Sequence, residues 1–190
     1  MSQFRSVTLI ALGANVALTQ SELVTSLQKA IKMLADAGVT IRAVSKFYKT
    51  PAFPAGAGPD YINAALVAIT DWAPARLLEE LHRIEAEMGR KRVQRWGQRC
   101  LDLDLIAVDD IVMPDAQTYH DWVDLPLERQ MVEAPEQLIL PHPRVHERAF
   151  VLVPLADVAP DWVHPVRGQT VTQMRDALPA ALRDEVTVME

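Results

Sequence analysis

The segment LDLDLIAV, residues 101–108, alternates leucines with aspartates in a strict period of two. This period is typical of a β-strand, because successive side chains of a strand point to opposite faces of its sheet. The three leucines would then face a core, whereas Asp102 and Asp104 would lie together on the other face. The sequence therefore predicts a sheet with one packed face and one face that carries two carboxylates.

The segments before residue 101 predict the other members of that sheet. Runs of apolar or alternating residues predict strands at 7–12, 39–48 and 61–70, and leucines spaced by three or four predict helices over about 20–37 and 74–88. The order strand, helix, strand, strand, helix, strand is that of the α+β ferredoxin-like βαββαβ core. We expect a mainly antiparallel sheet with both helices on one face and the ligand site on the other.

The rest of the chain has weaker patterns. In order, we expect a turn at Gly13–Asn15, a proline- and glycine-rich loop at 50–60, a mostly loop stretch at 109–140, a turn at 141–143, a short apolar run at 149–155 that is helical or extended, and a last helix near 170–178. No repeat or linker divides the sequence. We therefore expect one domain over residues 1–190.

The composition fits a globular domain in a reducing compartment. Of the 190 residues, 49% are hydrophobic, which is enough for a core. The single cysteine, Cys100, excludes an internal disulfide, and the apolar run near the N-terminus is too short for a signal peptide or a membrane span. We expect a cytoplasmic monomer with no membrane partner.

A basic stretch comes immediately before the two aspartates, although the chain as a whole has a net charge of -6. Its charged members are Arg90, Lys91, Arg92, Arg95 and Arg99. Guanidinium groups offer planar pairs of donors to phosphate oxygens, and paired carboxylates are hard ligands suited to Mg²⁺. A local positive charge in an acidic chain favours an anion site over a general affinity for nucleic acid. Together these features predict a site for a polyphosphate and its metal.

Other interpretations of the same residues stay open. Trp96 lies among the arginines and could stack on a base, which is also typical of single-stranded nucleic-acid-binding proteins. The carboxylates would equally serve an ordinary kinase or a metal-dependent phosphohydrolase, and without the basic stretch Asp102 and Asp104 would more often be a solvated strand face. The sequence contains no Walker-type or Rossmann glycine motif, no zinc-ligand spacing and no serine-hydrolase motif.

Residues on two further segments could bind a second, flat substrate. Tyr61 and Asn63 share one face of the third predicted strand and could stack on a heterocycle and hydrogen-bond its edge. His142 lies in a rigid turn between two prolines, and Arg148 and Phe150 follow it. A packed core tyrosine and a surface histidine are the alternatives to these functional roles.

Taken in order, these motifs resemble those of the 6-hydroxymethyl-7,8-dihydropterin pyrophosphokinase family of folate biosynthesis. The matching residues are YKTPAF at 48–53, DYIN at 60–63, Arg90, RWGQR at 95–99, LDLDL at 101–105 and PHPRVHERAF at 141–150, within about residues 7–165. The resemblance implies transfer of pyrophosphate from ATP to the hydroxymethyl group of the pterin, with release of AMP. It also implies two Mg²⁺ ions bound to the triphosphate.

The resemblance assigns roles to individual residues. Asp102 and Asp104 would be catalytic metal ligands. Arg90 and Arg99 would be catalytic arginines that stabilise charge on the phosphates. Contacts with ATP are implied for Glu85, Arg92, Arg95, Trp96, Leu105, His142 and Arg148. Contacts with the pterin are implied for Thr50, Phe53, Tyr61, Asn63 and Phe150, with the rings of Tyr61 and Phe150 on either side of it.

Two features depart from the family's pattern. Gln98 stands where the family commonly has proline, which would loosen the arginine-rich loop. The stretch at about 113–135 is longer than in compact members, and we interpret it as a loop insertion. We expect this insertion to form an extra arm near the nucleotide, with a passive surface loop as an equal alternative.

Overall fold

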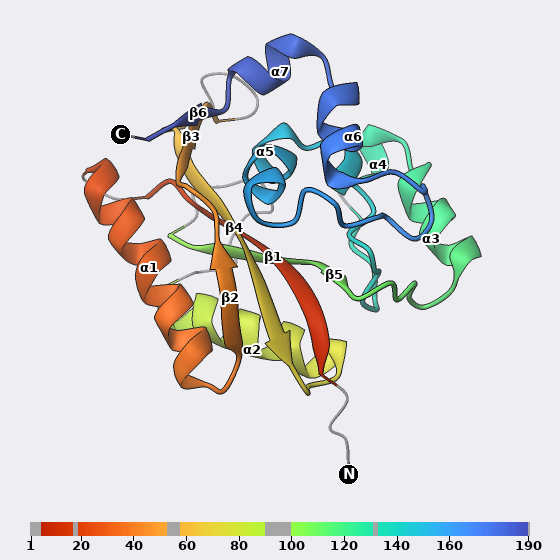
Figure 1. Cartoon of the computed structure of the whole chain (residues 1–190), viewed down its shortest axis with the longest axis horizontal. Coiled ribbons are helices and arrows are strands. Elements are labelled where there is room, and N and C mark those ends of the chain that lie inside the picture. The colour runs from red at the N-terminus through yellow and green to blue at the C-terminus, as the bar shows by residue number, and fades with distance from the viewer. Residues whose placement is uncertain (1–4, 17–18, 53–57, 90–99, 131–132, 190) are drawn as a thin grey trace.

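The computed structural model describes residues 5–16, 19–52, 58–89, 100–130 and 133–189 (Figure 1). Its strands are β1 (Ser6–Ala14), β2 (Thr40–Val44), β3 (Tyr48–Thr50), β4 (Tyr61–Thr70), β5 (Asp102–Val108) and β6 (Thr187–Val188). Its helices are α1 (Gln20–Asp36), α2 (Pro74–Glu87), α3 (Ala116–Val123), α4 (Leu127–Gln130), the short 3₁₀ helix η1 (Val145–Glu147), α5 (Ala149–Val158), α6 (Val171–Ala177) and α7 (Ala180–Asp184). Among the helices described, none is both long and apolar enough to cross a membrane.

The strands form one sheet in the order β5-β1-β4-β3-β6, and β2 also pairs with β4. Every paired strand runs antiparallel to its neighbour. The order places β1 between β4 and β5, as the βαββαβ unit requires when β2 and β3 together count as its second strand. The α+β fold predicted from the sequence is therefore confirmed.

The helices α1 and α2 lie on one face of the sheet and complete the main core (Figure 1). The predicted capping box is present, because Thr19 and Glu22 satisfy each other's backbone N–H groups at the start of α1. Pro74 occupies the first turn of α2. Leu103 and Leu105 of β5 are buried in the same core, as the period of two predicted. Gly89, with φ of 90°, follows the end of α2.

Helices partly cover the opposite face of the sheet. Their position on this face was not predicted from the sequence. There α5 and α6 form a second core with Leu9, Ala11 and Ile106 of the sheet. A ligand site on this face would therefore share it with α5 and α6, and Asp102 and Asp104 keep partial exposure there.

The second predicted strand is divided into β2 and β3. At the break, the Ser45 N–H donates to the Ala65 carbonyl, and the Ser45 Oγ accepts from the Ala65 N–H, each over 2.9 Å. The next N–H, of Lys46, donates instead to Asp157 Oδ2 on α5 over 3.2 Å. The strand is interrupted because side chains replace the regular backbone partners at this point.

The stretch after β5, predicted as mostly loop, contains two short helices, α3 and α4, that were not predicted from the sequence. Asp115 caps α3 by accepting the Thr118 N–H over 2.9 Å. Met113 and Leu140 exchange two backbone hydrogen bonds of 2.9 and 3.1 Å, which close the stretch at its base. An eight-residue helix has too few turns to give a clear apolar period. Further along, α5 and α6 match the predicted apolar run and last helix, whereas α7 and β6 were not predicted.

The side chain of Tyr119 connects α3 to the segment 162–169. Its side chain is 1% exposed, and its hydroxyl lies 3.0 Å from Nε2 of His164. The Nδ1 atom of His164 accepts the backbone N–H groups of Val166 and Arg167 over 3.2 and 3.3 Å. Because Nδ1 accepts, the neutral ring carries its hydrogen on Nε2 and donates it to the Tyr119 oxygen.

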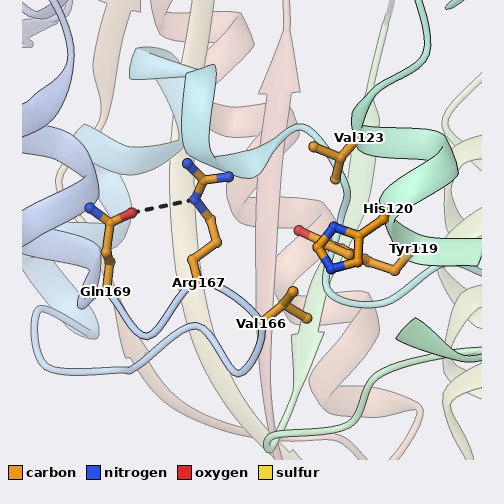
Figure 2. Close-up of a pocket in the computed structure, with 6 residues that line it drawn as sticks. All are labelled: Tyr119, His120, Val123, Val166, Arg167 and Gln169. Atoms are coloured by element: carbon orange, nitrogen blue, oxygen red, sulfur yellow. Dashed lines mark hydrogen bonds between the residues drawn. The ribbon is translucent and has the colours of Figure 1, made fainter. Parts of the chain in front are cut away.

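A cavity of about 260 Å³ lies beside this contact (Figure 2). It is lined by Tyr119, His120, Val123, Val166, Arg167 and Gln169. In Figure 2, Arg167 Nε donates to Gln169 Oε1 over 3.4 Å. The lining includes none of the site residues proposed from the sequence. The contact of Tyr119 with His164 joins α3, which lies in the predicted insertion, to segment 162–169. That the insertion forms an extra arm near the nucleotide stays a prediction.

The buried pair of His164 and Tyr119 is neutral near pH 7. Burial, the charge of Arg167 and the electrostatic effect of His146 together lower the pKa of His164 to about 4. Burial also raises the pKa of Tyr119 to about 12. In the unfolded chain a histidine titrates at about 6.5, so the unfolded state binds the proton more readily and acid favours unfolding.

We predict that the free energy of unfolding falls as the pH is lowered from 7 to 5. The lowered pKa of His164 stabilises the folded protein at pH values above the pKa of histidine in the unfolded chain. This contribution is lost as the pH falls towards the pKa of His164 in the folded protein, so His164 should account for about 2 kcal/mol of the loss. Denaturant unfolding at both pH values measures it. The loss should shrink by that amount in His164→Gln but not in the control His120→Gln, an exposed neighbour of Tyr119. The same pH dependence in His164→Gln and wild type would contradict this account.

Candidate active site

Four neighbouring strands place one row of residues across one face of the sheet. Tyr48 of β3 pairs with Asn63 of β4, Asn63 pairs with Gly13 of β1, and Gly13 pairs with Asp102 of β5. Directly paired residues of antiparallel strands project to the same face. The amide of Asn63 and the carboxylate of Asp102 therefore share a face, with their backbones two strand spacings, roughly 10 Å, apart.

Gly13 is the residue of this row that the sequence analysis misplaced. The expected turn is absent, because β1 continues through Gly13 to Ala14. A Cβ atom at Gly13 would lie 2.7 Å from Asn63 Oδ1, which is closer than real Cβ atoms come. A lone glycine in a strand pattern often marks such a close approach, so the signal was present in the sequence.

Asp102 and Asp104 lie on this face and are partly buried, while Leu103 between them points into the main core. Arg148, the residue before α5, brings its Nη1 atom within 3.3 Å of Asp104 Oδ2. Burial lowers the pKa of the Arg148 guanidinium, and the charge of Asp104 acts in the opposite direction. The structure thus pairs one of the predicted metal ligands with a predicted ATP-binding cation.

Asp102 and Asp104 offer hard oxygen ligands of the kind that suit a magnesium ion. Within the described ranges, no group of three or more His, Cys, Asp and Glu side chains comes together to hold a metal ion. Mg²⁺ in nucleotide enzymes is held by one or two carboxylates and completes its octahedron with water and phosphate oxygens. Asp102 and Asp104 on alternate positions of one strand supply such a pair.

His142 lies along the outer edge of β5, close to these carboxylates. The backbone N–H of His142 donates to the Ile106 carbonyl over 2.7 Å, and its ring Nδ1 accepts the backbone N–H of Arg144 over 3.1 Å. Burial, and then the charge of Arg148, lower the pKa of His142 well below its usual value. The neutral ring therefore carries its hydrogen on Nε2, which suits it to donate to a phosphate oxygen.

The other end of the row can recognise a flat, polar molecule. Asn63 is 5% exposed, and its Nδ2 donates to Thr50 Oγ1 over 2.7 Å, which fixes the orientation of the amide. Tyr61 lies on the same face two residues away, and Phe150 is 39% exposed at the start of α5. The guanidinium carbon of Arg148 lies 5.7 Å from the centre of the Phe150 ring. Arg148 therefore connects the aromatic end of the site with its carboxylate end.

A hydrogen bond that the sequence did not reveal holds α5 at this site. The Tyr48 hydroxyl donates to Asp157 Oδ2 over 2.8 Å, although 109 positions separate the two residues. Burial and this hydrogen bond raise the pKa of Tyr48 to about 12. Asp157 lies near the end of α5, and Arg148 and Phe150 lie at its beginning. The contact fastens this helix to β3, and no local pattern could have paired residues so far apart.

Two residues predicted to contact the nucleotide lie on the face covered by α1 and α2. Glu85 of α2 is 1% exposed, and its Oε1 accepts the backbone N–H of Leu103 over 2.8 Å. Leu105 is 4% exposed within the main core. These contacts hold α2 against β5, and a nucleotide contact for either residue stays a prediction.

Several predicted site residues lie outside the described part of the chain. They are Phe53, Arg90, Arg92, Arg95, Trp96 and Arg99. Gln98, the departure from the family's pattern, also lies there. The roles assigned to these residues stay predictions. The described residues that the structure does bring together on one face are Thr50, Tyr61, Asn63, Asp102, Asp104, His142, Arg148 and Phe150.

Two carboxylates beside a guanidinium, on the sheet face that also carries an amide and two aromatic rings, are the kinds of group that enzymes use to transfer phosphate groups to an acceptor. Comparison with known proteins gives the particular family. The family model described as 7,8-dihydro-6-hydroxymethylpterin-pyrophosphokinase (HPPK) matches residues 9–160. The chain belongs to this family.

Two named relatives agree with this assignment. The chain is 38% identical over 166 residues to a 2-amino-4-hydroxy-6-hydroxymethyldihydropteridine pyrophosphokinase of Synechocystis sp., covering 87% of this chain and 72% of that protein. It is 35% identical over 165 residues to the protein of the same name from Haemophilus influenzae, covering 87% of this chain and 88% of that protein.

Wild-type HPPK-DHPS of Plasmodium falciparum has a similar fold. The match has a TM-score of 0.63 at 15% identity and covers 91% of this chain. It covers 44% of that chain, so this chain spans less than half the length of that protein. At this identity the likeness concerns the fold alone, and it supports the α+β architecture described above.

Proposed function

We propose that this chain transfers pyrophosphate from ATP to the hydroxymethyl group of 6-hydroxymethyl-7,8-dihydropterin and releases AMP, as a step of folate biosynthesis. The observation that carries the proposal is the row across β3, β4, β1 and β5, which puts Asn63 and Asp102 on one face. Family membership and the names of the relatives support the same reaction. They give no support to the alternative, a single-stranded nucleic-acid-binding protein.

The acceptor end would bind the pterin by stacking and by hydrogen bonds. The rings of Tyr61 and Phe150 would lie on either side of the heterocycle. Asn63 donates one Nδ2 hydrogen to Thr50, so its Oδ1 and its other Nδ2 hydrogen can pair with the polar edge of the pterin. Asn63 is held in place before the substrate arrives, which lowers the entropic cost of binding.

The phosphate end would neutralise and align the triphosphate. Asp102 and Asp104 would hold two Mg²⁺ ions, which supply charge neutralisation when bound. Arg148 and the neutral Nε2–H of His142 would donate to phosphate oxygens, and Arg90 and Arg99 would stabilise the charge that develops during transfer. In-line transfer to a positioned hydroxyl depends mainly on such alignment and neutralisation.

We further propose a single-domain monomer that works in the cytoplasm. The single cysteine fits a reducing compartment. A single sheet contains all the described strands, which supports one domain. The partners of the protein would then be ATP and the pterin, with no nucleic acid or membrane.

Product analysis tests the proposed reaction. With ATP, Mg²⁺ and 6-hydroxymethyl-7,8-dihydropterin, the protein should form AMP and pterin diphosphate in equal amounts, which anion-exchange chromatography measures. Formation of ADP would indicate an ordinary kinase, and formation of free phosphate without a pterin product would indicate a hydrolase. Either result, or an absence of turnover, would contradict the proposal.

The substitution Asp104→Asn should lower the turnover number by at least about a hundredfold, because it removes a charged metal ligand and keeps the shape of the side chain. The melting temperature should change little, since Asp104 is partly exposed on the sheet face. Asp36→Asn makes the same chemical change at an exposed residue of α1 and should keep full activity. Full activity in Asp104→Asn would place the metal elsewhere.

A further inference from the structure

We propose that Gly13 is a positioning residue that determines how the acceptor substrate lies, because its missing side chain lets the Asn63 amide rest against the sheet in the orientation that faces the substrate. The inference rests on the proposed function. It extends that function by assigning a role to a residue without a side chain, at the centre of the row across the four strands.

The Asn63 side chain approaches Gly13 closely. An added Cβ would lie 2.7 Å from Asn63 Oδ1, 3.9 Å from Asn63 Cγ and 3.9 Å from Tyr61 Cδ1. The amide of Asn63 thus occupies the volume that any other residue at position 13 would need. Asn63 and Tyr61, which surround this volume, are both proposed to contact the pterin.

The Asn63 amide cannot move aside freely. Asn63 is 5% exposed, and its Nδ2 is held by Thr50 Oγ1 at 2.7 Å. A shift away from a methyl group at position 13 would strain or break that hydrogen bond. The donor and acceptor atoms that face the substrate would then change their direction.

The backbone itself does not require glycine at position 13. The glycines with positive φ in the described chain are Gly38, Gly89 and Gly168, and Gly13 is not among them. It lies in regular strand pairing with Asn63 on one side and Asp102 on the other. The requirement for glycine is therefore one of space on the substrate face, not of backbone conformation.

The space above Gly13 lies on the path between the two substrates. A heterocycle held by Asn63 must extend its hydroxymethyl group towards phosphates held near Asp102, across roughly two strand spacings. At position 13 only a hydrogen atom lies beside the Asn63 amide. A side chain there would displace that amide, and the displaced amide would turn the hydroxyl of the bound acceptor away from the phosphate.

A double-mutant cycle tests the role of Gly13. In Gly13→Ala the dissociation constant of the pterin should rise by about tenfold, the effect expected for one disturbed hydrogen bond, while that of Mg²⁺-ATP should stay within about twofold. In the Asn63→Ser background the same methyl group no longer meets an amide, so adding Gly13→Ala should change pterin binding by less than about twofold. Fluorescence titration and calorimetry measure both ligands.

A matched control and a ligand-free measurement complete the test. Gly58→Ala adds the same methyl group where it would meet Asn15 Nδ2 at an ordinary 3.9 Å, and it should bind the pterin as wild type does. Without any ligand, NMR should show that the Asn63 side-chain amide loses protection from solvent exchange in Gly13→Ala. If Gly13→Ala proves unstable, adding Asn63→Ser should restore stability.

The outcomes separate this inference from the proposed function. Wild-type pterin affinity in Gly13→Ala, an equal loss in both backgrounds, or an unstable Gly13→Ala that Asn63→Ser does not restore would overturn the role of Gly13 and leave the proposed function intact. A wild-type protein that binds ATP but no pterin would overturn the proposed function, and the role of Gly13 with it.

Discussion

The antiparallel pairing of β1 with β4 and with β5 fixes the geometry on which the proposed site depends. Through β1, Asn63 and Asp102 are held in register by antiparallel backbone pairing that is regular from Ile10 to Gly13. A slip of β5 by one residue would send Asp102 and Asp104 into the main core and Leu103 and Leu105 out of it. Burial of two carboxylates is costly, so the leucines of β5 hold the aspartates on the ligand face.

The helix α5 supplies the second half of the site from above the sheet. Its N-terminal end carries Phe150 and follows Arg148, whose guanidinium lies near both the Phe150 ring and Asp104. Its other end is tied to β3 by Asp157 and Tyr48. The acceptor end and the metal end are therefore coupled twice, through the strand register and through one helix.

The sequence predicted the parts of this arrangement that depend on local periodicity. The alternation in β5, the capping box of α1 and the spacing of leucines in α2 are properties of neighbouring residues, and the fold followed from their order. The cover by α5 and α6 could not be predicted, because it depends on which apolar surfaces meet in three dimensions. The contact of Tyr48 with Asp157 and the approach of Asn63 to Gly13 join residues distant in sequence, and Gly13 was misread because a glycine after an apolar run also predicts a turn.

The most direct test of the central claim is a crystal structure of the protein with Mg²⁺, a non-hydrolysable ATP analogue and the pterin. The account predicts that Gly13, Asn63 and Asp102 keep their register, that the metal binds Asp102 and Asp104, and that the pterin lies between Tyr61 and Phe150 with its polar edge on Asn63. A pterin or metal bound away from this face, or a shifted pairing of β1 with β5, would contradict the account.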